Sequence, residues 1–163
     1  MMVNLLHLTS LNFLSTNVNI NIKFNNIIRD ILKDSFWVIV FCNFPLARIV
    51  HEYKHFYVIR DAFPVTPLHS LIITKRHVVS YFQCSKAELE EIPMILDTQK
   101  TELKYLDNEI TGYNIGMNIG EDAGQSIFHC HIHVIPRREG DVENPQGGVR
   151  SVIPSKQHYI RKK

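Results

Sequence analysis

Three histidines that alternate with apolar residues constrain the fold of this chain more than any other feature. His129, His131 and His133 are separated by single residues. The residues beside and between them are apolar, namely Phe128, Cys130, Ile132 and Val134. Since successive side chains of a strand point to opposite faces of a sheet, the pattern predicts a strand with one imidazole face and one core face. Surface histidines on an edge strand are the alternative, but an unsupported row of three is an improbable one.

From about residue 37 the chain is rich in strand-like segments. Apolar runs of strand length occur at 48–53, 55–60, 69–74, 113–119 and 127–135. The glycine-bounded segment 120–124 predicts a turn between the last two. Ser85 and Glu88 form a capping box, and the apolar residues after them recur at helical spacing, which predicts one main helix. Pro93 lies inside that pattern and is expected to kink or break the helix.

The chain of 163 residues has the length of one ordinary domain, with a different composition at each end. In residues 1–36, asparagine is interspersed with isoleucine, leucine and valine. Neither the strand period of 2 nor the helix period of 3.6 is kept for long there. We interpret these residues as a weakly structured or helical N-terminal extension. The compact domain is then expected at 37–163, ending in a polar, basic tail that contains Gly147 and Gly148.

Charge and cysteine content exclude several classes of protein. A formal net charge of only +2 argues against a nucleic-acid coat, so no nucleic-acid partner is expected, whereas a small anionic ligand remains compatible. No apolar run is long enough for a membrane span. Three widely spaced cysteines favour a reducing compartment over a disulfide framework. The N-terminus lacks a basic segment before its apolar patches, so we expect a cytoplasmic protein.

The histidine row suits two kinds of chemistry. Histidines two residues apart in a strand can share a zinc ion. Alternatively, one imidazole acts as a nucleophile toward phosphorus while the others orient it and bind phosphate oxygens. The preceding residues Gly124, Gln125 and Ser126 offer backbone N–H groups, an amide and a hydroxyl, which suit an anion. These neighbours favour the nucleophile.

The segment 124–137 reads Gly-Gln-Ser-x-x-His-x-His-x-His-x-x-Pro-Arg, which resembles the signature of the histidine triad (HIT) superfamily of nucleotide hydrolases and transferases. The resemblance extends over roughly 41–157, and the segments 136–141 and 147–150 resemble the bacterial diadenosine polyphosphate hydrolase-like branch. It implies an α+β, HIT-like fold with an antiparallel sheet of about five strands and one main helix. It also implies a homodimer that needs no cofactor and binds a nucleotide substrate.

The resemblance assigns roles to individual residues. It makes His131 the nucleophile that forms a nucleotidyl-histidine intermediate, places His133 on the phosphate and leaving group, and has His129 orient His131, with His69 as a possible partner. The remaining nucleotide-binding positions that it implies are Asp61 on the ribose, Asn118 near the α-phosphate, and Gly124, Gln125 and Ser126 on phosphate oxygens. Simpler structural roles stay open for three of them: a turn residue for Asp61, a partly buried core histidine for His69, and a strand-end polar residue for Asn118.

The chain also departs from the family pattern. Leu68 and Thr74 stand where members usually have glycine and proline, and Leu68 strains the backbone if its φ is positive. The Cys-x-x-Cys of many bacterial members is reduced to Cys42, which leaves Cys42, His77 and His129 as an incomplete zinc set, so we expect no bound metal. The predicted function is hydrolysis of dinucleoside polyphosphates or related nucleoside phosphoanhydrides or phosphoramidates. Nucleotidyl transfer through the same intermediate and non-catalytic nucleotide binding are the alternatives.

Overall fold

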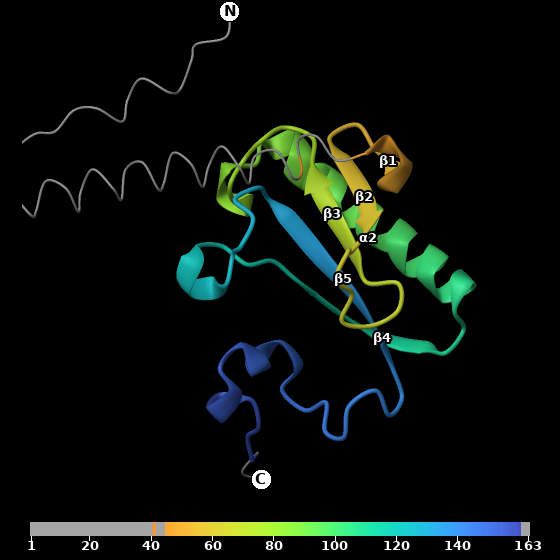
Figure 1. The fold of residues 1–163 in the computed structure, drawn as a ribbon, viewed down its shortest axis with the longest axis vertical. Coiled ribbons are helices and arrows are strands. Elements are labelled where there is room, and N and C mark those ends of the chain that lie inside the picture. Colours follow the sequence, from red (N-terminus) through yellow and green to blue (C-terminus); the bar gives the residue numbers. More distant parts are fainter. Residues whose placement is uncertain (1–40, 42–44, 161–163) are drawn as a thin grey trace, which may run out of the picture. The chain divides into compact units, whose positions relative to one another are not determined.

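The computed structural model describes residue 41 and residues 45–160; the expected N-terminal extension and Cys42 lie outside this part of the chain. Five strands form one antiparallel sheet in the order β1-β2-β3-β5-β4 (Figure 1). They are β1 (Ile49–Glu52), β2 (Phe56–Arg60), β3 (Ser70–Thr74), β4 (Ile110–Gly116) and β5 (His131–Arg138). Together with α2 (Lys86–Leu106), the one long helix among residues 45–160, they confirm the predicted α+β fold.

Short 3-10 turns occupy the connections. They are η2 (Leu46–Arg48), η3 (Tyr81–Gln83), η4 (Glu121–Ala123), η5 (Gly148–Val152) and η6 (Pro154–Lys156). The strands begin and end within a few residues of the predicted limits, except near the histidines. There β4 ends at Gly116, and β5 begins only at His131, so His129 precedes the strand.

Helix α2 begins at the predicted capping box. The Ser85 hydroxyl accepts the Glu88 N–H, and the Glu88 carboxylate accepts the Ser85 N–H at 2.6 Å. Of the two outcomes expected at Pro93, a kink or a break, the break is wrong, because the helix continues through the proline. Pro93 is exposed, and the helix packs on the core on both sides of it, through the partly buried Ile92 before the proline and the buried Ile95 and Leu103 after it. No helix of residues 45–160 has the length and apolarity that crossing a bilayer requires.

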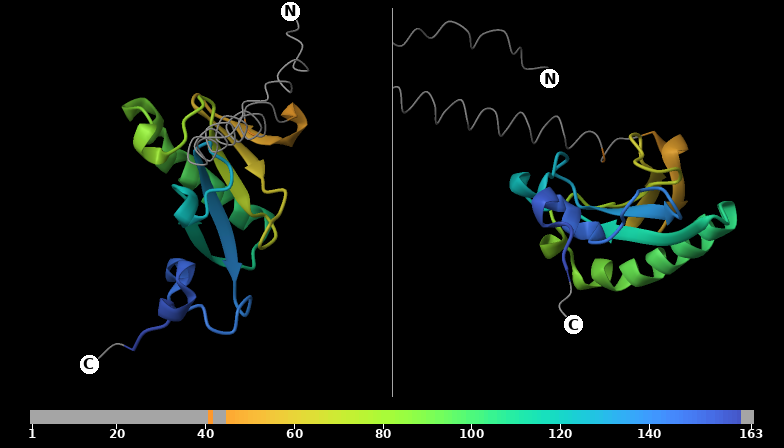
Figure 2. Two further views of the ribbon diagram at one scale, coloured as in Figure 1. Left: turned by 60° about the vertical axis from the view of Figure 1, so that its left-hand side comes forward. Right: turned by 90° about the horizontal axis from the view of Figure 1, so that it is seen from below.

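Strand β5 has the two different faces that the alternating pattern predicts. Ile132 and Val134 are buried in one cluster with Ile95 and Leu103 of α2, which lies along that face of the sheet (Figure 2). His131 and His133 belong to the other set of β5 side chains and are paired in register with Ile73 and Leu71 of β3. The sheet therefore presents the imidazoles on the face that α2 leaves open.

The residues after β5 turn back toward β4. Arg138 pairs with Asp107 at the end of α2, and Arg137 pairs with Asp141. Gly147 has a φ of +90°, and a Cβ there would lie 2.2 Å from the backbone oxygen of Gln157. Only glycine fits both this backbone conformation and this close approach, so the segment that contains η5 and η6 has a defined path.

Leu68 has a φ of +67°, which is the left-handed conformation. Glycine adopts this conformation without strain, which explains why family members usually have glycine at this position. The Leu68 side chain packs against the cluster under α2, so packing offsets the backbone strain. We expect Leu68→Ile, which keeps the volume but adds a β-branch, to lower the free energy of unfolding by about 1–2 kcal/mol. We expect Leu68→Gly, which loses packing but relieves strain, to change it by less than about 1 kcal/mol. Urea denaturation measures both, and a larger loss in the glycine variant would contradict a strained Leu68.

Candidate active site

His131 opens β5 with one ring nitrogen fixed by the backbone. Its Nδ1 lies 2.7 Å from the carbonyl oxygen of His129. Because a carbonyl oxygen only accepts, Nδ1 carries the proton and Nε2 keeps its lone pair. The ring is buried and lies edge-on to Phe41, with ring centroids 5.2 Å apart. Burial lowers the pKa of His131, so the imidazole is neutral at pH 7 and Nε2 is a nucleophilic nitrogen.

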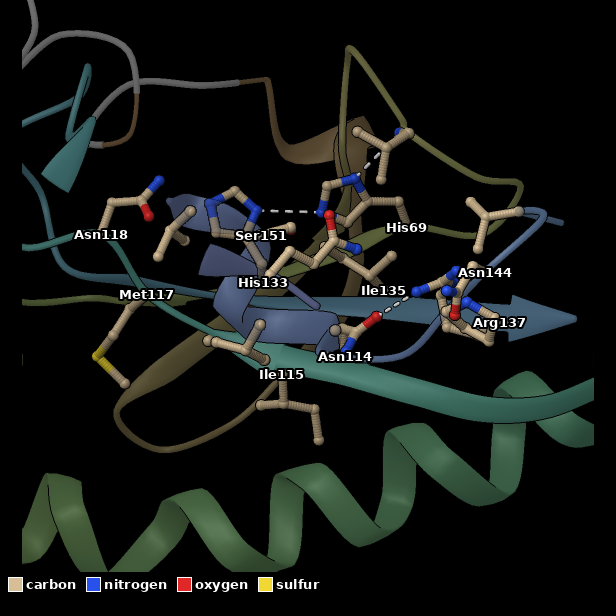
Figure 3. A pocket seen from close by; sticks show the side chains of 18 residues that line it. His69, Asn114, Ile115, Met117, Asn118, His133, Ile135, Arg137, Asn144 and Ser151 are labelled. Carbon is tan, nitrogen blue, oxygen red and sulfur yellow. Dashed lines mark hydrogen bonds between the residues drawn. The ribbon is translucent and has the colours of Figure 1, made fainter. Parts of the chain in front are cut away.

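A chain of hydrogen bonds determines which ring nitrogen of His133 carries the proton. The Val65 N–H lies 3.3 Å from Nδ1 of His69 and donates to it. Nε2 of His69 then carries the proton and donates to Nδ1 of His133 at 3.0 Å (Figure 3). Burial lowers the pKa of His133 to about 4, so the ring is neutral and its proton is on Nε2. His133 is therefore a hydrogen-bond donor beside the nucleophilic nitrogen of His131, with the two ring centroids 5.0 Å apart.

Asp61 combines a turn with contact to the histidines. Its Oδ1 accepts the Phe63 N–H at 2.9 Å, which is the turn role that its neighbourhood also allowed. Its Oδ2 lies 3.4 Å from Nδ1 of His69. The structure thus places His69 between Asp61 and His133, rather than beside His129 as the resemblance had suggested.

His129 turns its ring away from His131. Nε2 of His129 donates to the Thr74 carbonyl oxygen at 2.7 Å, and Nδ1 lies 3.3 Å from Nδ1 of His77. Burial lowers the pKa of His129 to about 4. What orients His131 in this structure is the carbonyl group of His129 and not its imidazole. His77 and His129 lie together as the incomplete zinc set requires.

The loop before the histidines is held by Gln125. Its side-chain oxygen accepts the Gly120 N–H at 2.8 Å, and its amide nitrogen donates to the Val79 carbonyl at 2.7 Å. The buried Gln125 carboxamide therefore braces the loop with both ends of its amide. Gly124, with a φ of +81°, is the C-cap of η4. Ser126 follows Gln125 directly and is exposed.

Three of these groups could also bind a cation. One ligand atom each from Asp61, His69 and His133 lies within 4.8 Å of the other two. A carboxylate and two imidazoles are suitable ligands for a divalent transition metal. Nε2 of His69 and Nδ1 of His133 share a hydrogen bond of 3.0 Å, so a cation bound through these two atoms would have to replace it.

A cavity of about 450 Å³ opens beside His133 and runs between the sheet and the C-terminal segment (Figure 3). Asn118 and His69 line it near His133. The opposite wall includes Val149 and, beyond it, residues that the sequence analysis did not identify, namely Ser151, Val152 and Gln157. The paired glycines at 147 and 148 were the one signal in that tail, since they mark a close backbone approach.

Comparisons with known proteins place this site in a family. The family model described as HIT domain matches residues 46–140. A HIT-like protein of Mycoplasma pneumoniae is 32% identical over 104 residues, which cover 61% of this chain and 72% of that protein. The crystal structure of a histidine triad nucleotide-binding protein from Sulfolobus tokodaii is 31% identical, with a TM-score of 0.55 over 65% of this chain and 70% of that one.

A second solved structure is a zinc-bound histidine triad family protein from Mycobacterium smegmatis. It is 31% identical, with a TM-score of 0.57 over 69% of this chain and 81% of that one. The family match covers more than half of the 163 residues and includes all three histidines of the row. The chain therefore belongs to the HIT, or histidine triad, family.

Proposed function

We propose that this protein is a nucleotide hydrolase that acts on dinucleoside polyphosphates and related nucleoside phosphoanhydrides or phosphoramidates. The observation that carries the proposal is the tautomer of His131, which is buried, neutral and held through Nδ1 so that Nε2 is the nucleophile. The Sulfolobus tokodaii relative is described as nucleotide-binding, which supports the substrate class.

In the first step, Nε2 of His131 attacks the α-phosphorus of the substrate. A P–N bond forms as the P–O bond to the leaving phosphate breaks, or the P–N bond in a phosphoramidate. The leaving group takes the electron pair of the broken bond. The Nε2–H of the neutral His133 donates a hydrogen bond that stabilises this charge, and a leaving amine takes the proton it needs from solvent water. The Nδ1–H bond to the His129 carbonyl stabilises the positive charge that develops on His131.

In the second step, water attacks phosphorus and releases a proton to the solvent as the P–N bond to His131 breaks. The ring nitrogen recovers its lone pair, and the nucleoside monophosphate leaves with one oxygen from water. Asp61, through its carboxylate, and Asn118, through its amide, hold the ribose and the α-phosphate in this proposal, and the exposed Ser126 contacts the phosphate. Gln125 acts on the phosphate indirectly, because its amide holds the loop that carries Ser126.

We also propose that the protein functions as a homodimer. Strand β4 is at one end of the sheet and pairs only with β5 among the described strands. Its Ile115 is exposed, and an edge strand with an exposed apolar side chain is a surface that pairs with another chain.

The acceptor in the second step separates a hydrolase from a nucleotidyl transferase. We expect diadenosine tetraphosphate in ¹⁸O-water to give AMP that carries the label and ATP that does not. We expect added inorganic phosphate to leave this product pattern unchanged. Formation of ADP, by transfer of the adenylyl group from His131 to added phosphate in place of water, would instead identify a transferase. Binding of the dinucleotide without any turnover would contradict catalysis and favour a nucleotide-binding protein.

A further inference from the structure

The cavity beside His133 is larger than the proposed chemistry requires. The reacting α-phosphate needs only the surroundings of His131, His133 and Ser126. The cavity extends from His133 and Asn118 along β4 and β5 to the η5 segment, with about 450 Å³ of space. Volumes of this size are typical of sites that bind a whole small molecule. We call this cavity the C-terminal compartment, because η5 and the residues up to Gln157 form its outer wall.

The walls of the compartment are apolar and, in part, uncovered. Val149 and Val152 on η5 are 60% and 74% exposed, although both line the cavity. Ile135 of β5 and Met117 after β4 form the opposite wall. These apolar side chains can contact the face of an aromatic ring, which gains by leaving water.

The polar groups that line the compartment are either neutral or paired with an opposite charge. Arg137 lines it, but the Asp141 carboxylate holds the guanidinium with two bonds of 2.7 and 2.8 Å. Arg137 also lowers the pKa of Asp141 to about 2, so this ion pair persists at all ordinary pH values. Asn118 and Ser151 have no hydrogen-bond partner within residues 45–160. The compartment therefore suits an uncharged polar group with an aromatic ring better than a chain of phosphates.

The residues that line the compartment show which side of the reacting phosphate it adjoins. His133, the proposed donor to the leaving group, lines it, whereas the nucleophile His131 and the ribose-binding Asp61 do not. An occupant is thus continuous with the leaving side of the scissile bond. We propose that the C-terminal compartment binds the second nucleoside of a dinucleoside polyphosphate, the one that departs with the leaving group. This inference rests on the proposed function and adds the substrate preference that the site imposes.

Val152→Trp tests the inference, because the larger side chain fills the compartment from the η5 wall. The matched control is Ile153→Trp, since Ile153 is the next residue, is also exposed at 56%, and does not line the cavity. The two substrates are diadenosine tetraphosphate, which carries a second nucleoside, and adenosine 5′-phosphoramidate, whose leaving group is ammonia. The readout is the ratio of kcat/KM for the dinucleotide to that for the phosphoramidate. We expect Val152→Trp to lower this ratio at least tenfold, mainly through KM for the dinucleotide, and Ile153→Trp to change it by less than twofold.

The outcomes separate failure of the inference from failure of the proposed function. An unchanged ratio in Val152→Trp, or an equal fall in both variants, would overturn the second-nucleoside site while the wild-type protein still cleaves both substrates. A wild-type protein that cleaves neither substrate would overturn the proposed function and the inference with it. Circular dichroism of both variants shows whether a change in the ratio comes from a folded protein.

Discussion

Replacing His131 with glutamine is expected to reduce kcat for diadenosine tetraphosphate by at least about 10⁴-fold, because the variant has no nitrogen lone pair with which to attack phosphorus. The glutamine amide can still donate to the carbonyl group of His129, so the backbone around β5 keeps a partner for that group. We expect KM to change far less than kcat, since the nucleophile contributes to the transition state more than to binding. Steady-state kinetics with purified variant and wild-type protein measures both.

The control for this variant is His51→Gln. His51 lies on β1, an edge strand of the sheet, and its Nε2 contacts Glu102 of α2. Its loss removes an imidazole and a hydrogen bond without touching the three histidines. We expect turnover within about twofold of the wild type, because a partly exposed pair of this kind affects stability by about 1 kcal/mol or less. Comparable activity in the two variants would exclude His131 as the nucleophile.

Acidification from pH 6.5 to about 4 is expected to destabilise the fold through His129 and His133. Burial lowers the pKa of each from 6.5 to about 4, so between these values the unfolded chain binds protons that the folded protein does not. The free energy of unfolding therefore stays level above pH 6.5, falls as the pH drops through the window, and levels off for these groups below about pH 4. The shifts correspond to a loss on the order of 3 kcal/mol for each histidine.

The carboxylates titrate at lower pH than these histidines, so the two contributions to the pH dependence of stability can be measured separately. The pKa values of Glu88 and Asp141 are lowered to about 2 from 4.5 and 3.8, so their stabilisation is lost only below about pH 4.5. Urea unfolding at several pH values between 6.5 and 4.5 therefore reports mainly the histidines. We expect His133→Gln to flatten the slope in that window. A slope equal to that of the wild type would contradict a neutral, buried His133.

The sequence predicted the fold because each level of information agreed with the others. The alternation at 128–134 requires one buried face, and Ile132 and Val134 do pack on α2. The capping box at Ser85 marks the start of α2 because its two hydrogen bonds are local and depend on no distant residue. The expectation at Pro93 was also based on local sequence alone. It did not include the packing of the helix on the sheet, which keeps α2 continuous.

The arrangement of the site was less accessible from the sequence. Alternation places three histidines on one face only if the strand includes all of them, but β5 begins at His131 and the ring of His129 contacts Thr74 and His77. The saturation of the Gln125 amide by backbone groups at 79 and 120 depends on loops brought together by folding. The position of Val149 and Val152 in the cavity wall could not be predicted, because the polar tail has no hydrophobic period that would indicate its packing beside β4.

The most direct test of the account is whether a nucleotide becomes bonded to His131. Wild-type protein is mixed briefly with diadenosine tetraphosphate, quenched at alkaline pH, where phosphohistidine-type bonds survive, and measured as intact protein and as peptides. We predict a mass increase of one adenylyl group on the peptide that contains His131, and no increase in His131→Gln. An adduct on another residue, or turnover by the wild type that proceeds equally well in His131→Gln, would contradict the account.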